Sequence, residues 1–94
     1  MVIGVCTILL RIPQSHSLKD KRQVLRSLTS RVRSTFNVSI AEVDQLAAWQ
    51  SATLGVACVS SDRDYAHGLL TKVAEAISTY RMDAELYDYR IELY

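Results

Sequence analysis

Glycine and proline are scarce in this sequence, which contains three Gly and one Pro among 94 residues. Flexible linkers and disordered tracts are rich in these residues, so we expect no linker and no low-complexity segment. Hydrophobic residues make up 49% of the chain and charged residues 22%. This composition is typical of a globular protein, and the length suits a single domain over residues 1–94 with no room for a second.

Long hydrophobic runs are also missing. The most apolar stretch runs from Val2 to Leu10, far short of the ~20 residues that a helix needs to span a bilayer. It lacks a basic leader and a cleavage-like site, so it does not match a secretory signal peptide. We interpret this stretch as a buried strand and expect a cytoplasmic protein without membrane association.

Cysteine and histidine are too few to build a disulfide framework or a metal site. Cys6 and Cys58 each lie inside an apolar run, where a reduced thiol behaves as a small hydrophobic group. His16 and His67 lie in different segments, and neither has a Cys or a second His at the spacing of metal ligands. We predict two core cysteines, no metal and no cofactor.

Hydrophobic periodicity predicts two central strands and a first helix. Residues 2–12 and 52–59 are apolar on both faces, which is typical of strands buried in the middle of a sheet. Residues 18–36 have the spacing of an amphipathic helix, with Ser17 as N-cap and Asp20 in the capping-box position. The apolar stripe of this helix contains Leu18, Leu25, Leu28, Val32 and Phe36.

Shorter patterns predict the remaining elements. Residues 38–43 form a short strand with a bulge at Ala41 or Glu42, which suits the edge of a sheet. A second helix follows a cap at Ser61 or Asp62, and its apolar face contains Ala66, Leu69, Leu70, Val73, Ile77 and Tyr80. The last segment alternates as a half-exposed strand, with Tyr87, Tyr89, Ile91 and Leu93 on one face.

The order of these elements is strand, helix, strand, strand, helix, strand. Two crossovers of helix length within one sheet define an α+β, ferredoxin-like βαββαβ fold. We therefore expect a four-stranded antiparallel sheet with two helices on one face. The strands at 2–12 and 52–59 are predicted to be central, and the other two to form the edges.

Helices cover only one face of such a sheet, yet the central strand at 52–59 is apolar on both. Its two alternating sets are Leu54, Val56 and Cys58 on one side and Gly55, Ala57 and Val59 on the other. An apolar sheet face is more readily covered by another subunit than left in water. We therefore predict a homodimer.

Positive charge is concentrated in one part of the chain. Residues 11–33 hold seven of the eleven Lys and Arg residues and a single acid, Asp20. The segment after Phe36 holds four bases and nine acids. This asymmetry, within a net charge of +1, indicates a directional surface that attracts phosphate groups.

The helix predicted at residues 18–36 arranges four of these bases in a row. They fall within about 60° of one another and extend over ~21 Å of the axis. The row consists of Lys19, Arg22, Arg26 and Arg33, and the patch is widened by Lys21 and Arg31. Since Arg binds phosphate in a bidentate way and Lys as a point charge, we predict contact with RNA or a ribosomal particle. The row also suits a helix face that is simply solvated, one that is paired with acids elsewhere in the chain, or one that binds an acidic protein partner.

The sequence lacks the base-stacking residues, the phosphate-binding loop and the catalytic groups that other proteins of this topology use. RNA-recognition motifs stack bases on aromatic residues of the central strands, but residues 3–12 and 52–59 contain none. Acylphosphatases carry a glycine-rich phosphate loop after the first strand, whereas residues 12–17 contain no glycine. His16 lies between two serines, yet no acid is placed to orient it. We predict no catalytic residue and a binding protein rather than an enzyme.

Trp49 and Gln50 lie in the connection between the strands at 38–43 and 52–59. A tryptophan in a loop often anchors local packing, and it can also be a contact hot spot for a partner. We predict an interaction loop at these two residues. The alternative function is therefore a homodimeric protein-interaction or small-ligand regulatory module that acts through the sheet face or this loop.

Several short blocks together resemble the YlxP-like family of small bacterial proteins. The blocks are SLKDKR at 17–22, FNVSIAEV at 36–43, WQ at 49–50 and VSS at 59–61. The resemblance covers nearly the whole chain and implies a ferredoxin-like fold. Members are often encoded beside transcription-termination, translation-initiation and ribosome-maturation factors, which implies an RNA-related setting. The chain departs from the family at Ala47 and Ser51, where relatives often carry an acid and an Arg.

Overall fold

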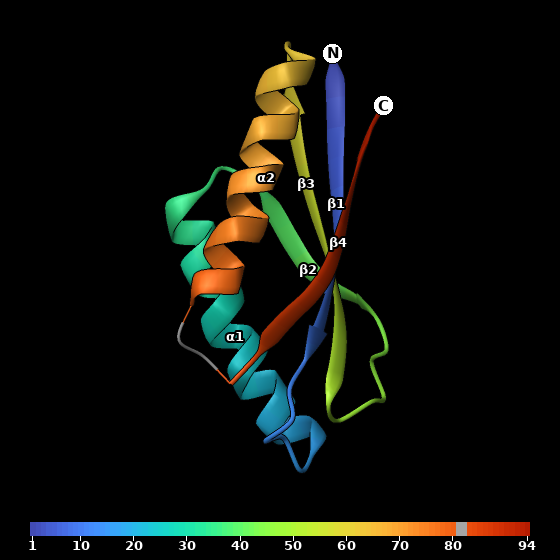
Figure 1. The fold of residues 1–94 in the computed structure, drawn as a ribbon, viewed down its shortest axis with the longest axis vertical. Coiled ribbons are helices and arrows are strands. Elements are labelled where there is room, and N and C mark those ends of the chain that lie inside the picture. Colours follow the sequence, from blue (N-terminus) through green and yellow to red (C-terminus); the bar gives the residue numbers. More distant parts are fainter. Residues whose placement is uncertain (81–82) are drawn as a thin grey trace.

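The computed structural model describes residues 1–80 and 83–94 (Figure 1). In chain order the elements are β1 (Val2–Arg11), α1 (Leu18–Thr35), β2 (Ser39–Asp44), β3 (Ser51–Ser60), α2 (Arg63–Thr79) and β4 (Glu85–Leu93). This is the βαββαβ order predicted from the hydrophobic periodicity.

The strands form an antiparallel sheet in the order β2-β3-β1-β4. β1 pairs with β3 along its whole length, from Val2 opposite Ser60 to Arg11 opposite Ser51. β1 and β3 are therefore central, and β2 and β4 are edges, as their apolar patterns predicted. Both helices lie on one side of the sheet (Figure 1), which confirms the ferredoxin-like fold and leaves the other face open.

The core lies between the sheet and the two helices. Alternate residues of β1 are buried on the helix side, namely Val2, Gly4, Cys6, Ile8 and Leu10. The helices oppose them with Leu25, Leu28, Val32, Ala66, Leu70, Val73, Ala74 and Ile77. Burial of each large side chain stabilises the fold by ~1.5–3 kcal/mol. α2 lies close to β1 at Gly4, where a Cβ would lie 2.8 Å from Cδ1 of Leu70 and would force this side chain to shift.

Both cysteines are buried and free, which confirms their predicted position in the core. Burial raises the pKa of the Cys6 thiol to about 11. The thiolate is the reactive form of cysteine, so Cys6 is unreactive at neutral pH.

Both helices begin at side-chain caps. The Ser17 hydroxyl accepts a hydrogen bond from the backbone N–H of Asp20 at 3.0 Å, and the Asp20 carboxylate accepts one from the backbone N–H of His16 at 2.9 Å. The bond to Ser17 satisfies a donor that the first turn of α1 leaves free, whereas Asp20 binds the residue before the cap rather than the cap itself, so the predicted capping box is only half formed. In α2 the cap is Asp62, whose carboxylate accepts from the backbone N–H of Tyr65 at 3.1 Å.

Edge strand β2 contains a bulge, but not at the predicted position. Its register against β3 shifts between Glu42 and Asp44, so Val43 is the extra residue, rather than Ala41 or Glu42. Glu42 consequently stays opposite the buried Leu54, and its side chain points to the helix side of the sheet.

Edge strand β4 also departs from its predicted alternation. Its register shifts so that Leu9 pairs with Asp88 and Leu10 with Leu86, and Tyr87 becomes the extra residue. The prediction that Tyr87 shares a face with Ile91 and Leu93 is therefore wrong. The β4 residues that pack against the core are Leu86, Ile91 and Leu93.

Candidate nucleic-acid interface

The row predicted on α1 is exposed along the helix and borders a hollow. All four of its members, Lys19, Arg22, Arg26 and Arg33, are exposed. Three of them line a hollow of about 350 Å³ between α1 and β2. We name this hollow the arginine groove, and its lining consists of Arg22, Leu25, Arg26, Thr29, Arg33, Ala41, Glu42 and Leu54.

The arginine groove has an apolar floor beneath its cationic wall. Leu25 from α1 and Leu54 from β3 are both buried, so they form the bottom of the hollow. Arg33 closes one end, since its Nη2 donates to the backbone carbonyl of Ile40 on β2 at 2.8 Å. This bond also satisfies a backbone acceptor on the free edge of the sheet. A guanidinium has five N–H donors, so Arg33 keeps most of them for a ligand.

Lys21 does not widen the basic patch, and this prediction is wrong. Its side chain is only 1% exposed, and its Nζ lies 2.7 Å from Oε2 of Glu42. The same ammonium donates to the backbone carbonyls of Gln45 at 3.0 Å, Ser51 at 3.3 Å and Leu46 at 3.4 Å. A buried charge requires such partners, and these four oxygens compensate for its loss of water.

The sequence does contain a signal for this buried pair. Lys21 lies three residues after Leu18 and four before Leu25, which places it within the apolar stripe of α1. Glu42 lies two residues after the buried Ile40, which places it on the helix side of β2. Periodicity therefore predicts that the side chains of Lys21 and Glu42 both point toward the core. It does not show that the two side chains contact each other.

Two further bases of the basic segment contact tyrosine rings. The guanidinium of Arg31 lies 4.2 Å from the ring centre of Tyr80, at the end of α2, and that of Arg11 lies 4.5 Å from the ring centre of Tyr87. These cation–π contacts direct both side chains toward neighbouring elements. Of the seven bases in residues 11–33, one is buried and two lie over tyrosines. The remaining four are the predicted row.

The loop between β2 and β3 is fixed to the rest of the protein by its own polar groups. The Gln50 side-chain amide donates to the backbone carbonyls of Pro13 at 3.2 Å and Ser15 at 3.1 Å. The Gln45 side-chain carbonyl accepts from the Thr53 hydroxyl at 2.9 Å. Gln50 therefore holds the loop in place although it is itself exposed, and Trp49 is 55% exposed.

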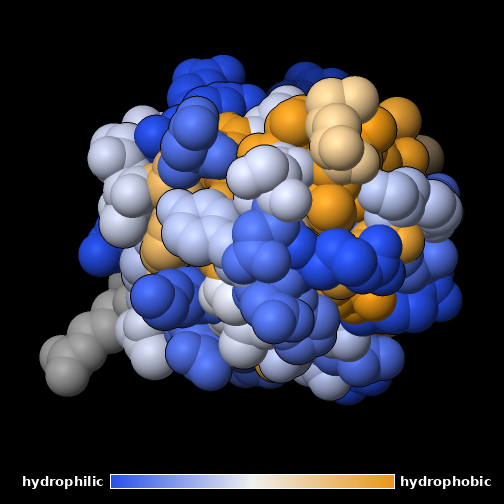
Figure 2. All heavy atoms as spheres, turned by 90° about the horizontal axis from the view of Figure 1, so that it is seen from above, coloured by the Kyte–Doolittle hydropathy of each residue, from blue (hydrophilic) through white to orange (hydrophobic). Residues whose placement is uncertain are grey.

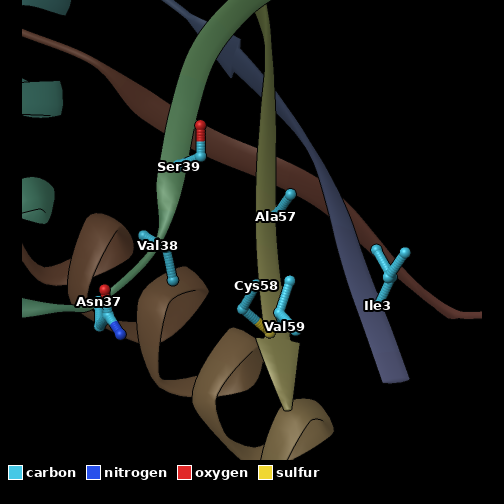
Figure 3. Close-up of a pocket in the computed structure, with 7 residues that line it drawn as sticks. All are labelled: Ile3, Asn37, Val38, Ser39, Ala57, Cys58 and Val59. Atoms are coloured by element: carbon cyan, nitrogen blue, oxygen red, sulfur yellow. The ribbon is translucent and has the colours of Figure 1, made fainter. Parts of the chain in front are cut away.

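The sheet face opposite the helices is apolar at one end, whereas its β4 edge carries Asp88, Arg90 and Glu92. Figure 3 shows that Ile3, Ala57 and Val59 point away from α2, whereas the sulfur of Cys58 points toward it. These residues line a second hollow, of about 310 Å³, beside the start of β2. Val59 is 68% exposed and Ile3 40%. Figure 2, which looks onto the end of the molecule that holds both termini, shows hydrophobic residues gathered at one side of that end.

Metal and membrane features were sought in residues 1–80 and 83–94. In this part of the chain, no group of three or more His, Cys, Asp or Glu side chains is placed to hold a metal ion. Neither α1 nor α2 has the combination of length and hydrophobicity that crossing a membrane requires.

The fold and the groove define a small α+β protein of ferredoxin-like topology with a cationic hollow on its first helix. The family described as "Protein of unknown function (DUF503)" matches residues 3–91. The chain is also 41% identical over 64 residues to "Uncharacterized protein YlxP" of Bacillus subtilis (strain 168), which covers 68% of this chain and 70% of that relative. The chain therefore belongs to the DUF503 family, and the resemblance to YlxP-like proteins is confirmed.

Proposed function

We propose that this protein binds RNA, free or within a ribosomal particle, through the arginine groove, and that it acts in the cytoplasm as a binding protein rather than an enzyme. The observation that supports this proposal is the convergence of Arg22, Arg26 and Arg33 on one hollow. Three guanidinium groups around one concave surface are able to bind a single anionic ligand together. Lys19, one turn before Arg22, extends the cationic surface toward the start of α1.

The charges of the row are free to bind an anionic partner. Within residues 1–80 and 83–94, ion pairs are formed by Lys21 with Glu42 and by Arg90 with Glu92, and by none of the four bases of the row. The nine downstream acids therefore do not neutralise the row in the described chain, which weighs against a helix face paired with acids elsewhere. A row of ~21 Å is long enough to follow several phosphates of an extended strand.

Single-stranded RNA binding tests the proposal through its salt dependence. Four phosphate contacts predict a log-log slope of affinity against salt of about −3 for an oligouridine. Replacing two of the bases, in the variant Arg22→Ala/Arg26→Ala, is expected to reduce the slope to about −1.4 and to weaken binding at low salt. Fluorescence anisotropy over a range of salt concentrations measures both quantities.

A matched control separates the groove from net charge. The variant Arg63→Ala/Lys72→Ala removes two exposed bases from α2 and changes the net charge by the same amount. It is expected to keep the slope and affinity of the wild type. A wild-type slope near zero, or an equal loss in both variants, would contradict binding through the groove.

The open sheet face supports a second candidate function, that of a homodimeric interaction module. Ile3 and Val59 are directly opposite one another, as are Val5 and Ala57, so the two central strands form a continuous apolar surface at one end of this face. At about 3.3 Å per residue and about 4.8 Å between strands, the face measures roughly 500 Å² before side-chain relief is added. Stable interfaces bury about 800 Å² per partner, so the face approaches the size that a two-fold pair of identical chains requires.

Replacing Val59 with glutamate tests this second candidate. Val59→Glu places a charge in the apolar end of the proposed interface and is expected to convert a dimer into a monomer in sedimentation velocity at tens of micromolar. Tyr65→Glu is the matched control, because Tyr65 is an exposed hydrophobic residue on α2, away from the open face. A monomeric wild type, or a dimer that survives Val59→Glu, would rule out pairing through this face.

A further inference from the structure

The arginine groove contains a carboxylate that a phosphate-binding surface alone does not need. Glu42 lies on β2, in the wall that faces the arginines of α1. Lys21 balances the charge of this carboxylate, so Glu42 does not repel phosphates, but a free oxygen of Glu42 adds a hydrogen-bond acceptor that contact with phosphates alone does not use. The groove as a whole is matched to a ligand that carries negative groups and, between them, a hydrogen-bond donor.

The Glu42 carboxylate is held in position before any ligand arrives. Its Oε2 is buried and lies 2.7 Å from the Lys21 ammonium, while the side chain as a whole is 20% exposed. The ammonium is itself held by the backbone carbonyls of Gln45 and Ser51. Because Oε2 is committed to Lys21, Oε1 is the oxygen left to accept a hydrogen bond in the groove.

The shape of the groove suits a flat, partly apolar group. Its floor is formed by Leu25 and Leu54, and its volume of about 350 Å³ is at the lower end of the range for small-ligand pockets. Sequence-specific recognition of RNA commonly uses unstacked bases that are turned out of the strand and hydrogen-bonded at their edges. A single pyrimidine on this floor would bring its edge to the β2 wall and its phosphates to the α1 wall.

This inference rests on the proposed function. We propose that the arginine groove holds one cytosine base of single-stranded RNA and that the N4 amino group of this base donates to Oε1 of Glu42. Arg22 and Arg26 then contact the phosphates on either side. A carboxylate is a suitable acceptor for the cytosine amino group, whereas uracil presents its O4 acceptor at the same place and is repelled. The groove therefore selects cytosine over uracil, while the arginines supply affinity for either.

Affinities for two oligonucleotides of equal length test this selectivity. One contains uridine only, and the other has cytidines in its central positions. The wild type is expected to bind the cytidine-containing strand about tenfold more tightly, because a hydrogen bond to a charged acceptor is gained and a repulsion is removed. In the Glu42→Gln variant the amide can still accept from Lys21 and can also donate to uracil O4, so the preference is expected to fall below about twofold.

The salt slope distinguishes failure of this inference from failure of the proposed function. Equal wild-type affinities with a slope near −3 would overturn the cytosine site and leave RNA binding through the arginines intact. Absence of binding to both strands would overturn both proposals. If the Glu42→Gln variant loses both the salt dependence of binding and the preference for the cytidine-containing strand, Glu42 has a structural role. That result would contradict base selection.

A modified ligand provides a test that needs no protein variant. In N4,N4-dimethylcytidine both amino hydrogens are replaced by methyl groups, so the base cannot donate at this position. An oligonucleotide with this base is expected to bind the wild type about tenfold more weakly than the cytidine strand, at an unchanged salt slope. Undiminished affinity for the dimethylated strand would contradict the hydrogen bond to Glu42 even if the Glu42→Gln protein fails to fold.

Discussion

Replacing Lys21 with methionine is expected to lower the free energy of unfolding by about 3–5 kcal/mol, because it leaves the buried Oε2 of the Glu42 carboxylate without its counter-ion. The substitution also removes the donor that serves the backbone carbonyls of Gln45, Leu46 and Ser51. A domain of this size has a total stability of about 5–10 kcal/mol, so the variant is expected to be marginally folded. Urea denaturation followed by circular dichroism measures the loss.

Lys19 provides the matched control, because it is an exposed lysine on the same turn of α1. Lys19→Met is expected to change stability by less than about 0.5 kcal/mol. The double variant Lys21→Met/Glu42→Met removes both charges. Its free energy of unfolding is expected to be at least about 1 kcal/mol higher than that of Lys21→Met. Equal urea midpoints for Lys21→Met and Lys19→Met would show that the pair of Lys21 and Glu42 does not stabilise the fold.

The two neighbouring leucines of β1 are expected to respond very differently to truncation, since they lie on opposite faces of the sheet. Leu10 is fully buried beneath the helices, so Leu10→Ala is expected to lower the free energy of unfolding by about 2–5 kcal/mol through lost burial and the cavity left behind. Leu9 lies on the open face and is partly buried. In dilute protein, Leu9→Ala is expected to lower the free energy of unfolding by about 1 kcal/mol.

Protein concentration adds a second contrast between these leucines. If the open face pairs two chains, Leu9→Ala weakens self-association in sedimentation, and its effect on unfolding grows as the protein is concentrated. Leu10→Ala is expected to change stability by the same amount at every concentration, relative to wild type. Equal destabilisation by the two substitutions in dilute protein would contradict the assignment of the faces.

The sequence predicted the element order and the central strands correctly because these follow from local patterns. Residues 2–12 and 52–59 are apolar on both faces, and a strand with that property has to lie in the middle of a sheet. The Ser17 cap was also predictable, since it depends on residues within one turn. The positions of the bulges at Val43 and Tyr87 were not, because a bulge is defined by pairing with another strand.

The candidate site was predicted only in part. The helical repeat placed Lys19, Arg22, Arg26 and Arg33 in one row, and all four are exposed in the structure. Charge alone placed Lys21 in the same patch, although its position in the apolar stripe already indicated burial. Composition favours a lysine at the surface, and only its partners, 21 to 30 residues further along the chain, make burial tolerable.

The sequence by itself determined that this chain is a ferredoxin-like α+β protein with a row of four basic side chains on the first helix. These properties depend on the spacing of residues within single elements. The tertiary structure decided which bases remain free and that three of the arginines share a hollow with Glu42. The reason is that β2 supplies the opposite wall of that hollow, and its side chains take their direction from pairing with β3. A groove exists only where two elements meet, so no local pattern could define it.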